Sequence, residues 1–450
     1  MNIKVIIALI LQLTVYVSSY ADTCYDNPLN LSNSPKAVVG LYIEDLATGD
    51  VLYDVNGETP LIPASITKSV TTATLLSMKP ASDKFETRVL AAGTIKGGKL
   101  NGDVIIKAVG DPTIESSYFK EYAGFADSIV AGLERLGISE ITGTVVVDQS
   151  AVPEEDIPLG WADEDLVWSY GTSHHAANFK DNKFILTLPS KKSIPHIPGL
   201  KVSHTSAKSK LKVDRKRNSS VILSKGIIPK KGQSMTLANP LPGKSMCYAV
   251  LSAIRKNGIN IGNTQLNKHD VATEIYVHQS PKLIDIMRSL MFRSDNMMAE
   301  SMLRAFAPGE TRTEATKREL QLWTIRDVDT CGIVIEDGSG LSVNNRLTPY
   351  FLADIFVWMA SHLKASDYVS LFPKAGLDGT MKYFLNESHL KGSIAMKTGS
   401  MKGVQSYAGY KLDKNGYPTH VIVVIVNNFA CSRGKVKTEV ENLLLNTFPE

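Results

Sequence analysis

The stretch Pro63-Ala64-Ser65-Ile66-Thr67-Lys68 opens an apolar run, in which Val70 and Ala73 continue the helical spacing that Ile66 begins. A proline in the first turn is typical of a helix start, so we expect a helix from about Pro63 onward. Residues three positions apart share one face of a helix, which brings Lys68 within reach of the Ser65 hydroxyl. Because a serine hydroxyl is a poor nucleophile until a nearby base takes its proton, this stretch predicts an activated serine.

The Ser-x-x-Lys spacing is by itself a weak signal. It also occurs at Ser209, Ser361, Ser388 and Ser432. Only Ser65 follows Pro-Ala and opens an apolar helical run, although a helix cap at Ser65 and an exposed Lys68 would give the same letters. The context favours Ser65 as the nucleophile and Lys68 as its base.

Two further short motifs follow in order along the chain, Ser294-Asp295-Asn296 and Lys397-Thr398-Gly399. Each motif alone also fits a turn, a cap or an exposed strand end. Together with Ser65 they supply the groups that acyl transfer needs. A lysine acts as a base only if its pKa falls, and burial or a second cation such as Lys397 lowers it.

The other motif positions fit steps of the same reaction. Ser294 can relay a proton towards a leaving amine, and Asn296 can hold a substrate amide. Gly399 has no side chain to obstruct a substrate lying along its strand. The residue after it, Ser400, can offer a backbone N–H to a developing oxyanion.

Length and composition describe an ordinary globular protein. The chain has 450 residues, 43% of them hydrophobic and 21% charged, with a formal net charge of +4. This length predicts two or three domains. The small net charge gives no reason to expect a nucleic-acid partner.

The N-terminus predicts a secretory signal peptide over residues 1–21. Lys4 precedes an apolar stretch from Val5 to Val17, and Ser19-Tyr20-Ala21 fits a cleavage site. An uncleaved anchor is the alternative, but the stretch is short for a spanning helix. No later segment is apolar and long enough to span a membrane. We therefore expect an exported protein of the periplasm or cell envelope, cleaved near Ala21, with no integral span in the mature chain.

Periodicity suggests a domain interrupted by a long insertion. Alternating apolar residues predict a β-hairpin over Val38–Val55 and strands at Ala395–Thr398, Ser406–Leu412 and His420–Asn427. Helical spacing predicts a helix from Pro281 that continues through Met298 to Leu303, and a last helix carrying Val436, Val440, Leu443 and Leu444. Short β-rich runs dominate between about Ile95 and Tyr276.

The motif spacing leads to the same division, since 229 residues separate Ser65 from Ser294. That gap is far more than a compact catalytic domain needs. We predict a catalytic domain from residues 22–95 and 275–450. The inserted region covers 96–274 and contains a nested β domain at about 178–240.

Three other features carry weaker signals. A basic stretch predicts a solvated strand face, with attraction to anionic wall polymers as the alternative; it contains Lys208, Lys210, Lys212, Arg215, Lys216 and Arg217. His174-His175 is the only histidine pair, fits a solvated loop, and gives no reason to expect a metal or other cofactor. The pairing of the four cysteines, Cys24, Cys247, Cys331 and Cys431, stays open.

The ordered motifs are the signature of penicillin-binding proteins and class A β-lactamases. More specifically, the sequence resembles the D-alanyl-D-alanine carboxypeptidase/endopeptidase family, the class C low-molecular-mass penicillin-binding proteins. Further matching stretches cover nearly the whole mature chain: Gly110-Asp111-Pro112-Thr113, Val147-Asp148, Pro158-Leu159-Gly160-Trp161, Asp165-Leu166 and Asp337-Gly338-Ser339-Gly340-Leu341-Ser342.

This resemblance implies an α/β (α+β) fold, with an antiparallel sheet covered by helices and two inserted, mostly-β domains. It implies that Ser65 is acylated, that Lys397 and Thr398 bind the terminal carboxylate, and that the Ser65 and Ser400 N–H groups form the oxyanion hole. Substrates would be peptidoglycan stem peptides, and β-lactam antibiotics would be covalent inhibitors. Asp165 would contact a basic stem-peptide residue, although a structural role fits it as well.

Three positions depart from the family pattern, and they put substrate side-chain preference in doubt. Met291-Phe292-Arg293 stands where Met-Asn-Lys is common, Val343 where arginine is common, and Lys402 where glutamine is common. The sequence also leaves open the balance of carboxypeptidase and endopeptidase action.

Two other functions compete with the peptidase. A class A β-lactamase uses a Glu-x-x-Leu-Asn block between the second and third motifs, and no such block lies between Asn296 and Lys397. A catalytically inactive protein that binds the wall or senses β-lactams would have degenerate motifs, whereas all three are intact here.

Overall fold

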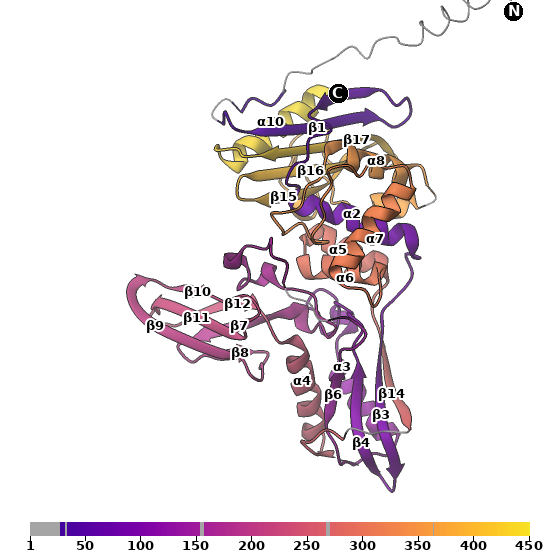
Figure 1. The fold of residues 1–450 in the computed structure, drawn as a ribbon, viewed down its shortest axis with the longest axis vertical. Coiled ribbons are helices and arrows are strands. Elements are labelled where there is room, and N and C mark those ends of the chain that lie inside the picture. Colours follow the sequence, from indigo (N-terminus) through magenta and orange to yellow (C-terminus); the bar gives the residue numbers. More distant parts are fainter. Residues whose placement is uncertain (1–27, 32–33, 154–156, 267–270, 363) are drawn as a thin grey trace, which may run out of the picture.

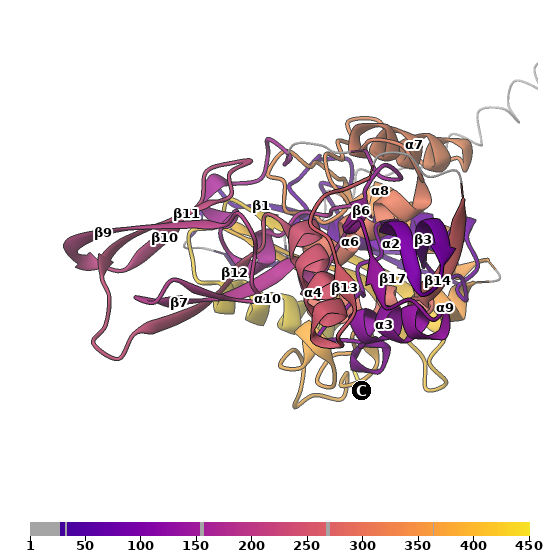
Figure 2. The ribbon, with the colours of Figure 1, turned by 90° about the horizontal axis from the view of Figure 1, so that it is seen from below.

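A computed structural model describes residues 28–31, 34–153, 157–266, 271–362 and 364–450. Figure 1 shows three parts. The upper part contains the N-terminal and C-terminal segments around one sheet, the lower part is a second sheet packed with α3 (Phe125–Arg135) and α4 (Pro242–Lys256), and a smaller β part projects to the side. Figure 2 shows from below that the β part extends away from the other two.

The upper part is built on a five-stranded, fully antiparallel sheet in the order β15-β16-β17-β1-β2. Its strands are β1 (Val38–Asp45), β2 (Val51–Val55), β15 (Ile394–Met401), β16 (Val404–Leu412) and β17 (Pro418–Asn427). Its helices are η1 (Ala64–Ile66), α2 (Thr67–Met78), α5 (Leu283–Arg293), α6 (Asn296–Phe306), α7 (Arg312–Ile325), α8 (Pro349–Ala360), α9 (Ala365–Val369), η6 (Gly379–Met381) and α10 (Arg433–Thr447).

Helices cover both faces of this sheet, which explains the unbroken apolar run of its central strand. Along β17, Val421, Val423 and Ile425 point into the core shared with α2, α5, α6 and α8. Ile422, Val424 and Val426 point to the other face, where α10 packs. A strand buried on both faces needs apolar residues at every position.

The lower part is a six-stranded sheet in the order β13-β5-β4-β3-β14, with β6 paired to β4. Its elements are β3 (Glu86–Lys96), β4 (Lys99–Lys107), η2 (Lys120–Tyr122), α3 (Phe125–Arg135), β5 (Glu140–Ile141), β6 (Val145–Asp148), α4 (Pro242–Lys256), β13 (Asn260–Ile261) and β14 (Ala272–Gln279). The chain enters through β3 and returns through β14, and the two strands pair antiparallel.

The side part contains two three-stranded sheets, β12-β7-β8 and β10-β11-β9. Its strands are β7 (Lys183–Leu188), β8 (Lys192–Ile194), β9 (Lys201–Lys210), β10 (Lys212–Asp214), β11 (Val221–Ile227) and β12 (Gln233–Ala238). Three short helices, η3 (Asp163–Asp165), η4 (Ser169–Gly171) and η5 (Lys180–Asn182), lie on the connection that leads to it.

The expected fold class is confirmed, and the hairpin, the three C-terminal strands and the last helix form where the periodicity places them. The helix expected from Pro281 to Leu303 is wrong as one element, because it breaks at Ser294-Asp295 into α5 and α6. The sequence analysis also missed α3 and α4 within the β-rich stretch. Their apolar residues do recur at helical spacing, as Phe125, Ile129 and Leu133 illustrate.

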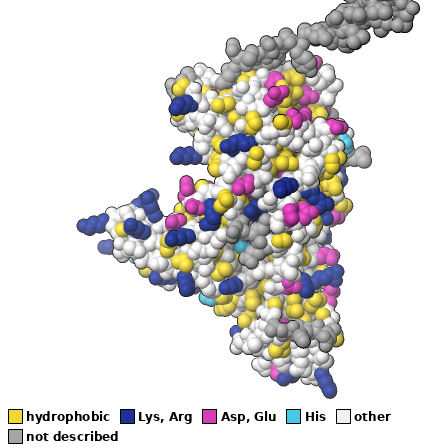
Figure 3. Space-filling view, in the orientation of Figure 1, with side chains coloured by type: hydrophobic (Ala, Val, Ile, Leu, Met, Phe, Trp, Pro, Cys, Tyr) yellow, Lys and Arg dark blue, Asp and Glu magenta, His cyan; other side chains and the backbone are white. Residues whose placement is uncertain are grey.

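The basic stretch is only partly a solvated face. Lys208, Lys210 and Lys212 are exposed, and cations gather on this projecting part in Figure 3. Arg215, in contrast, is 4% exposed and donates two hydrogen bonds to the Leu166 carbonyl, because the strand end turns it inward.

Arg217 is also bound rather than solvated. Its guanidinium donates to the carbonyls of Pro158 and Trp161 at 2.6 and 2.7 Å and pairs with Asp163. The two arginines thereby fix the segment that precedes the side part.

The histidine pair lies in a loop as expected, but both side chains are half-buried and hydrogen-bonded rather than fully solvated. His174 Nδ1 lies 2.9 Å from the Ser301 hydroxyl of α6 and 3.1 Å from the Asn178 amide. Burial lowers the pKa of His175 to about 4 and lowers that of His174 well below its usual value. Both rings are therefore neutral, packed side chains.

The described residues contain three free cysteines, Cys247, Cys331 and Cys431. Cys24 and the predicted signal peptide lie outside the described residues. In the described part of the chain, no helix is both long and apolar enough to cross a membrane.

Candidate active site

Ser65 lies where the chain turns from a loop into a buried helix. Ala64 adopts a left-handed conformation with φ of 51°, and the short helix η1 then leads directly into α2. Between Pro63 and Leu76, Ser65 is the one residue that is not buried. The local fold therefore presents this hydroxyl at the surface of an otherwise inaccessible helix.

Lys68 lies one turn further along and is completely buried. Its Nζ lies 3.0 Å from Ser65 Oγ and 2.7 Å from Asn296 Oδ1, and it also donates to the Ser339 carbonyl. Burial lowers the pKa of Lys68 to about 8, although nearby carboxylates, Asp337 first, act in the opposite direction. The amine thus points to the serine hydroxyl, and its pKa lies in the range that suits a general base.

The second motif forms the break between α5 and α6. Ser294 is left-handed, with φ of 59°, and Asp295 caps α6 by accepting from the Met298 N–H. Asn296, the first residue of α6, faces Lys68 and donates through Nδ2 to the Tyr170 carbonyl at 2.8 Å. The break turns the Ser294 and Asn296 side chains to the same site, which a continuous helix would not do.

The third motif lies on the edge strand β15. Lys397 is buried, and its Nζ donates to Ser294 Oγ at 3.0 Å and to the Thr398 carbonyl at 2.7 Å. Burial, with the charge of Lys68 as a further cause, lowers the pKa of Lys397 well below its usual value. The Thr398 hydroxyl donates to that of Thr380 at 2.9 Å.

Gly399 brings this strand against the nucleophile. A Cβ at this position would lie 2.6 Å from the Pro63 carbonyl oxygen, 2.9 Å from the Ser65 nitrogen and 2.2 Å from Ser406 Oγ. Two of these contacts are to backbone that cannot rotate away. The glycine is therefore needed for β15 to approach η1.

A buried loop that follows α7 supports the base, and the sequence analysis gave its residues no role. The Asp337 carboxylate accepts from the backbone of Gly340 and Ser342, from Asn345 Nδ2 at 2.8 Å, and from Trp161 Nε1 at 2.6 Å. This loop holds the carbonyl of Ser339 that receives Lys68. Trp161 belongs to the segment fixed by Arg215 and Arg217, so the side part is connected to the loop that binds Lys68.

Glu300 is a second residue that the sequence analysis missed. It is buried on α6, one turn after Asn296. Burial raises the pKa of Glu300 to about 8, and the neighbouring Asp337 adds to the effect. The i, i+4 spacing from Asn296 was the available signal, since it puts both residues on one helix face.

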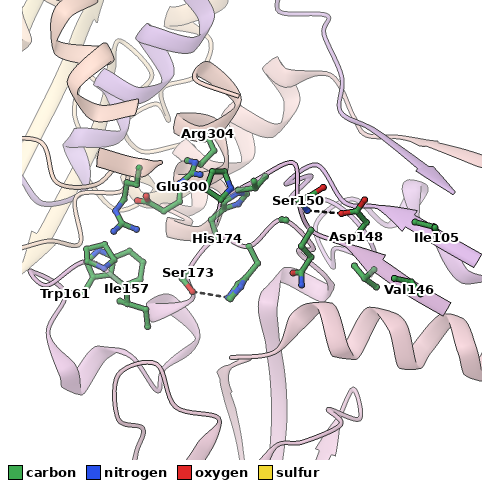
Figure 4. Close-up of a pocket in the computed structure, with 18 of the residues that line it drawn as sticks. Ile105, Val146, Asp148, Ser150, Ile157, Trp161, Ser173, His174, Glu300 and Arg304 are labelled. Carbon is green, nitrogen blue, oxygen red and sulfur yellow. Dashed lines mark hydrogen bonds between the residues drawn. The ribbon is translucent and has the colours of Figure 1, made fainter. Parts of the chain in front are cut away.

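Glu300 also lines a cavity of about 680 Å³ behind the site. Figure 4 shows Glu300 beside Arg304 and His174, with Trp161 and Ile157 on one side and Asp148 and Ile105 further away. The cavity is lined by residues of α6 and of the connection that follows β6.

Asp165 does not touch any of the three motifs directly. Its Oδ1 accepts from the Tyr170 hydroxyl at 2.8 Å, and the Tyr170 carbonyl binds Asn296. Ser400 is exposed at the end of the motif strand, where its hydroxyl donates to Gln405 Oε1. Among the described residues, no cluster of three or more histidine, cysteine or acidic side chains could hold a metal ion.

Comparisons with known proteins agree with this geometry. The model of the D-Ala-D-Ala carboxypeptidase 3 (S13) family matches residues 28–444. The D-alanyl-D-alanine carboxypeptidase DacB of Haemophilus influenzae is 27% identical over 431 residues, which is 89% of this chain and 88% of that protein. A D-alanyl-D-alanine carboxypeptidase of Actinomadura sp. is 25% identical over 87% of this chain and 78% of its own length.

A solved structure shows the same fold. The crystal structure of penicillin-binding protein 4 (dacB) from Haemophilus influenzae superposes with a TM-score of 0.81 at 24% sequence identity, covering 94% of this chain and all of that one.

Proposed function

The chain belongs to the D-Ala-D-Ala carboxypeptidase 3 (S13) family, and from this membership we propose that Ser65 is the residue that attacks the D-alanyl peptide bond. A serine-type carboxypeptidase activity follows from the family. The observation that carries the assignment to Ser65 is the 3.0 Å hydrogen bond to Lys68, a lysine whose pKa burial lowers to about 8. Such an amine is partly neutral near neutral pH and can take the serine proton.

Acylation then proceeds in a balanced sequence. Ser65 Oγ gives its proton to neutral Lys68 and bonds to the carbonyl carbon of the penultimate D-alanine. The C–N bond breaks, and the proton passes through Ser294 to the leaving amine. The product amine departs, and the peptide remains as an ester on Ser65 until a water molecule hydrolyses it.

The other motif residues bind the substrate in this proposal. The Ser65 and Ser400 N–H groups stabilise the oxyanion, a contribution of roughly 3 kcal/mol for one donor. Lys397 and Thr398 receive the terminal carboxylate, whose charge favours the protonated form of Lys397. Asn296 holds the substrate amide, and Gly399 keeps the strand open. Asp165, through Tyr170, lies on the same side as Asn296 and would face a basic side chain of the stem peptide.

The setting of this reaction is proposed as well. Residues 1–21 have the composition of a secretory signal peptide. Export would bring the enzyme to the periplasm or cell envelope, where peptidoglycan stem peptides occur. β-Lactam antibiotics would acylate the same serine.

The test is the intact mass of the mature protein after incubation with benzylpenicillin, beside a Ser65→Ala variant. We expect a stable one-to-one adduct on the native protein and none on the variant. Fast steady-state hydrolysis without a persistent adduct would instead indicate a β-lactamase. A folded native protein that forms no adduct and hydrolyses no penicillin would favour an inactive binding protein.

A further inference from the structure

A second concave surface adjoins the motifs on the side of Ser294. It is a groove of about 580 Å³ along α5, lined among others by Tyr118, Asp285, Arg288, Phe292, Arg293 and Thr380. A volume of this size lies within the range of about 300–1,000 Å³ that is typical of sites for drug-sized ligands. It is far larger than a released alanine requires.

One sequence neighbour and one hydrogen bond relate this groove to the reaction. Arg293 directly precedes Ser294, the proposed proton donor to the leaving amine, and Thr380 accepts the hydrogen bond of the Thr398 hydroxyl. In the proposed mechanism both Ser294 and Thr398 face the leaving group. The groove therefore continues the cleft in the direction in which the leaving group extends.

One wall of the groove is fixed by a cation–aromatic stack. The Arg293 guanidinium lies 4.4 Å from the centre of the Tyr118 ring. The Tyr118 hydroxyl accepts from Lys183 Nζ at 3.0 Å, and Lys183 forms an ion pair with Asp295 at 3.1 Å, where the two side chains are 19% and 6% exposed. Tyr118, a residue of the inserted region, thus carries the arginine, and Lys183 links Tyr118 to Asp295 of the second motif.

The groove carries unneutralised positive charge. Arg288 and Arg293 are both exposed, and within the described residues neither forms an ion pair with a carboxylate. The one acidic residue of the wall, Asp285, does not pair with them. A planar guanidinium that is already oriented binds a carboxylate with two parallel hydrogen bonds.

We propose that this groove binds the second stem peptide of a cross-linked substrate, and that Arg293, with Arg288, recognises the free carboxylates of that peptide. The inference rests on the proposed function, because it takes Ser294 and Thr398 as the leaving-group side. Free D-alanine would reach only the beginning of the groove. A leaving group that is itself a peptide would fill it and place its carboxylates against the arginines.

The experiment compares two purified substrates, an uncross-linked pentapeptide and a cross-linked muropeptide dimer, and uses Arg293→Ala and Arg288→Ala. We expect Arg293→Ala to lower kcat/KM for the dimer relative to that for the pentapeptide by roughly tenfold or more, the effect of losing a charged hydrogen bond. Arg288→Ala, at an exposed position that folding tolerates, should lower the same ratio less. Arg255→Ala, an exposed arginine on α4, is the matched control and should leave the ratio unchanged.

A substrate change separates recognition from a structural effect. A dimer in which the free carboxylates of the second stem peptide are amidated, except the one beside the scissile bond that Lys397 and Thr398 receive, should be cleaved more slowly than the native dimer by the wild type. Arg293→Ala should cleave the two dimers equally well. An equal loss on both substrates, or no change in the ratio, would overturn the inference. A wild type that releases D-alanine from the pentapeptide but does not cleave the dimer would also overturn it while leaving the proposed function intact, whereas a wild type without either activity would contradict the proposed function itself.

Discussion

Lysine occurs in two opposite settings in this molecule, the catalytic cleft and the projecting β part. Lys68 and Lys397 are fully buried, and each Nζ is held by specific oxygen atoms of the cleft. Lys208, Lys210 and Lys212 stand on exposed strand positions. The comparison shows that residue type alone does not determine the chemistry of a lysine. Burial makes the charged form costly and lowers the pKa of the amine, while exposure leaves a solvated cation.

Burying two amines is unfavourable, but hydrogen bonds to oxygen atoms of the cleft offset part of this cost. The Lys68 amine has three oxygen acceptors, one of them supplied by the loop that Asp337 organises. Buried polar groups without such partners would destabilise the fold. The same loop is attached through Trp161 to the inserted region, so the inserted region contributes to the site without touching Ser65.

The largest expected effect is on the rate of acylation when the buried Lys68 is removed. Lys68→Ala should slow acylation by benzylpenicillin by roughly 10²–10⁴-fold, the usual contribution of a general base. Lys208→Ala is the matched control and should acylate at the wild-type rate. The measurement is the rate of adduct formation followed by mass spectrometry. A Lys68→Ala variant that is folded and acylates at the normal rate would contradict the assignment of the base.

The sequence predicted much of the fold because the relevant signals are local. The alternation in Val38–Val55 and the helical spacing after Pro63 each depend on nearest neighbours, and both elements formed as expected. The strand predicted over His420–Asn427 also formed, as β17. The break at Ser294 was missed because Met287, Leu290, Met298 and Leu303 keep helical spacing on both sides of it, and only the Asp295 cap marks the interruption.

The candidate site was predictable where the motifs are short and ordered. The structure brings together Ser65, Lys68, Ser294, Asn296 and Lys397, which lie in three distant parts of the chain. Glu300 was missed although its spacing from Asn296 offered a signal. Ser339 could not be assigned from sequence, because it acts through a backbone carbonyl that any residue could provide. Arg215 and Arg217 were misinterpreted for a similar reason, since the carbonyls that bind them are invisible in a pattern of side chains.

A smaller effect is expected in the dependence of the acylation rate on pH. Lys68 acts as a base only when neutral, and its pKa is lowered to about 8, so the acylation rate should rise with pH and level off above about 8. Below that pH the rate should fall about tenfold per pH unit. Glu300, with a pKa raised to about 8, becomes negative over the same range and then favours protonated Lys68.

Glu300→Gln removes that negative charge while retaining the size of the side chain and one carbonyl oxygen. The midpoint of the pH profile should therefore move to lower pH, with a plateau rate close to that of the wild type. Adduct formation measured from pH 6 to pH 10 at constant ionic strength gives the midpoint. A midpoint that stays fixed would mean that Glu300 does not influence the base, and a shift to higher pH would reverse the sign argued here.

The smallest effect is expected in the projecting part. Replacing Lys208, Lys210 and Lys212 by glutamine should change the free energy of unfolding by no more than about 0.5 kcal/mol per position, as is usual for exposed sites. Release of D-alanine from a soluble pentapeptide should stay at the wild-type rate, because these amines have no part in the cleft. If they attract anionic wall polymers, retention on isolated cell walls should weaken and lose part of its dependence on salt. A slower reaction with the soluble peptide would show instead that the exposed lysines act on the catalytic cleft, and the contrast between the two regions would then be one of degree.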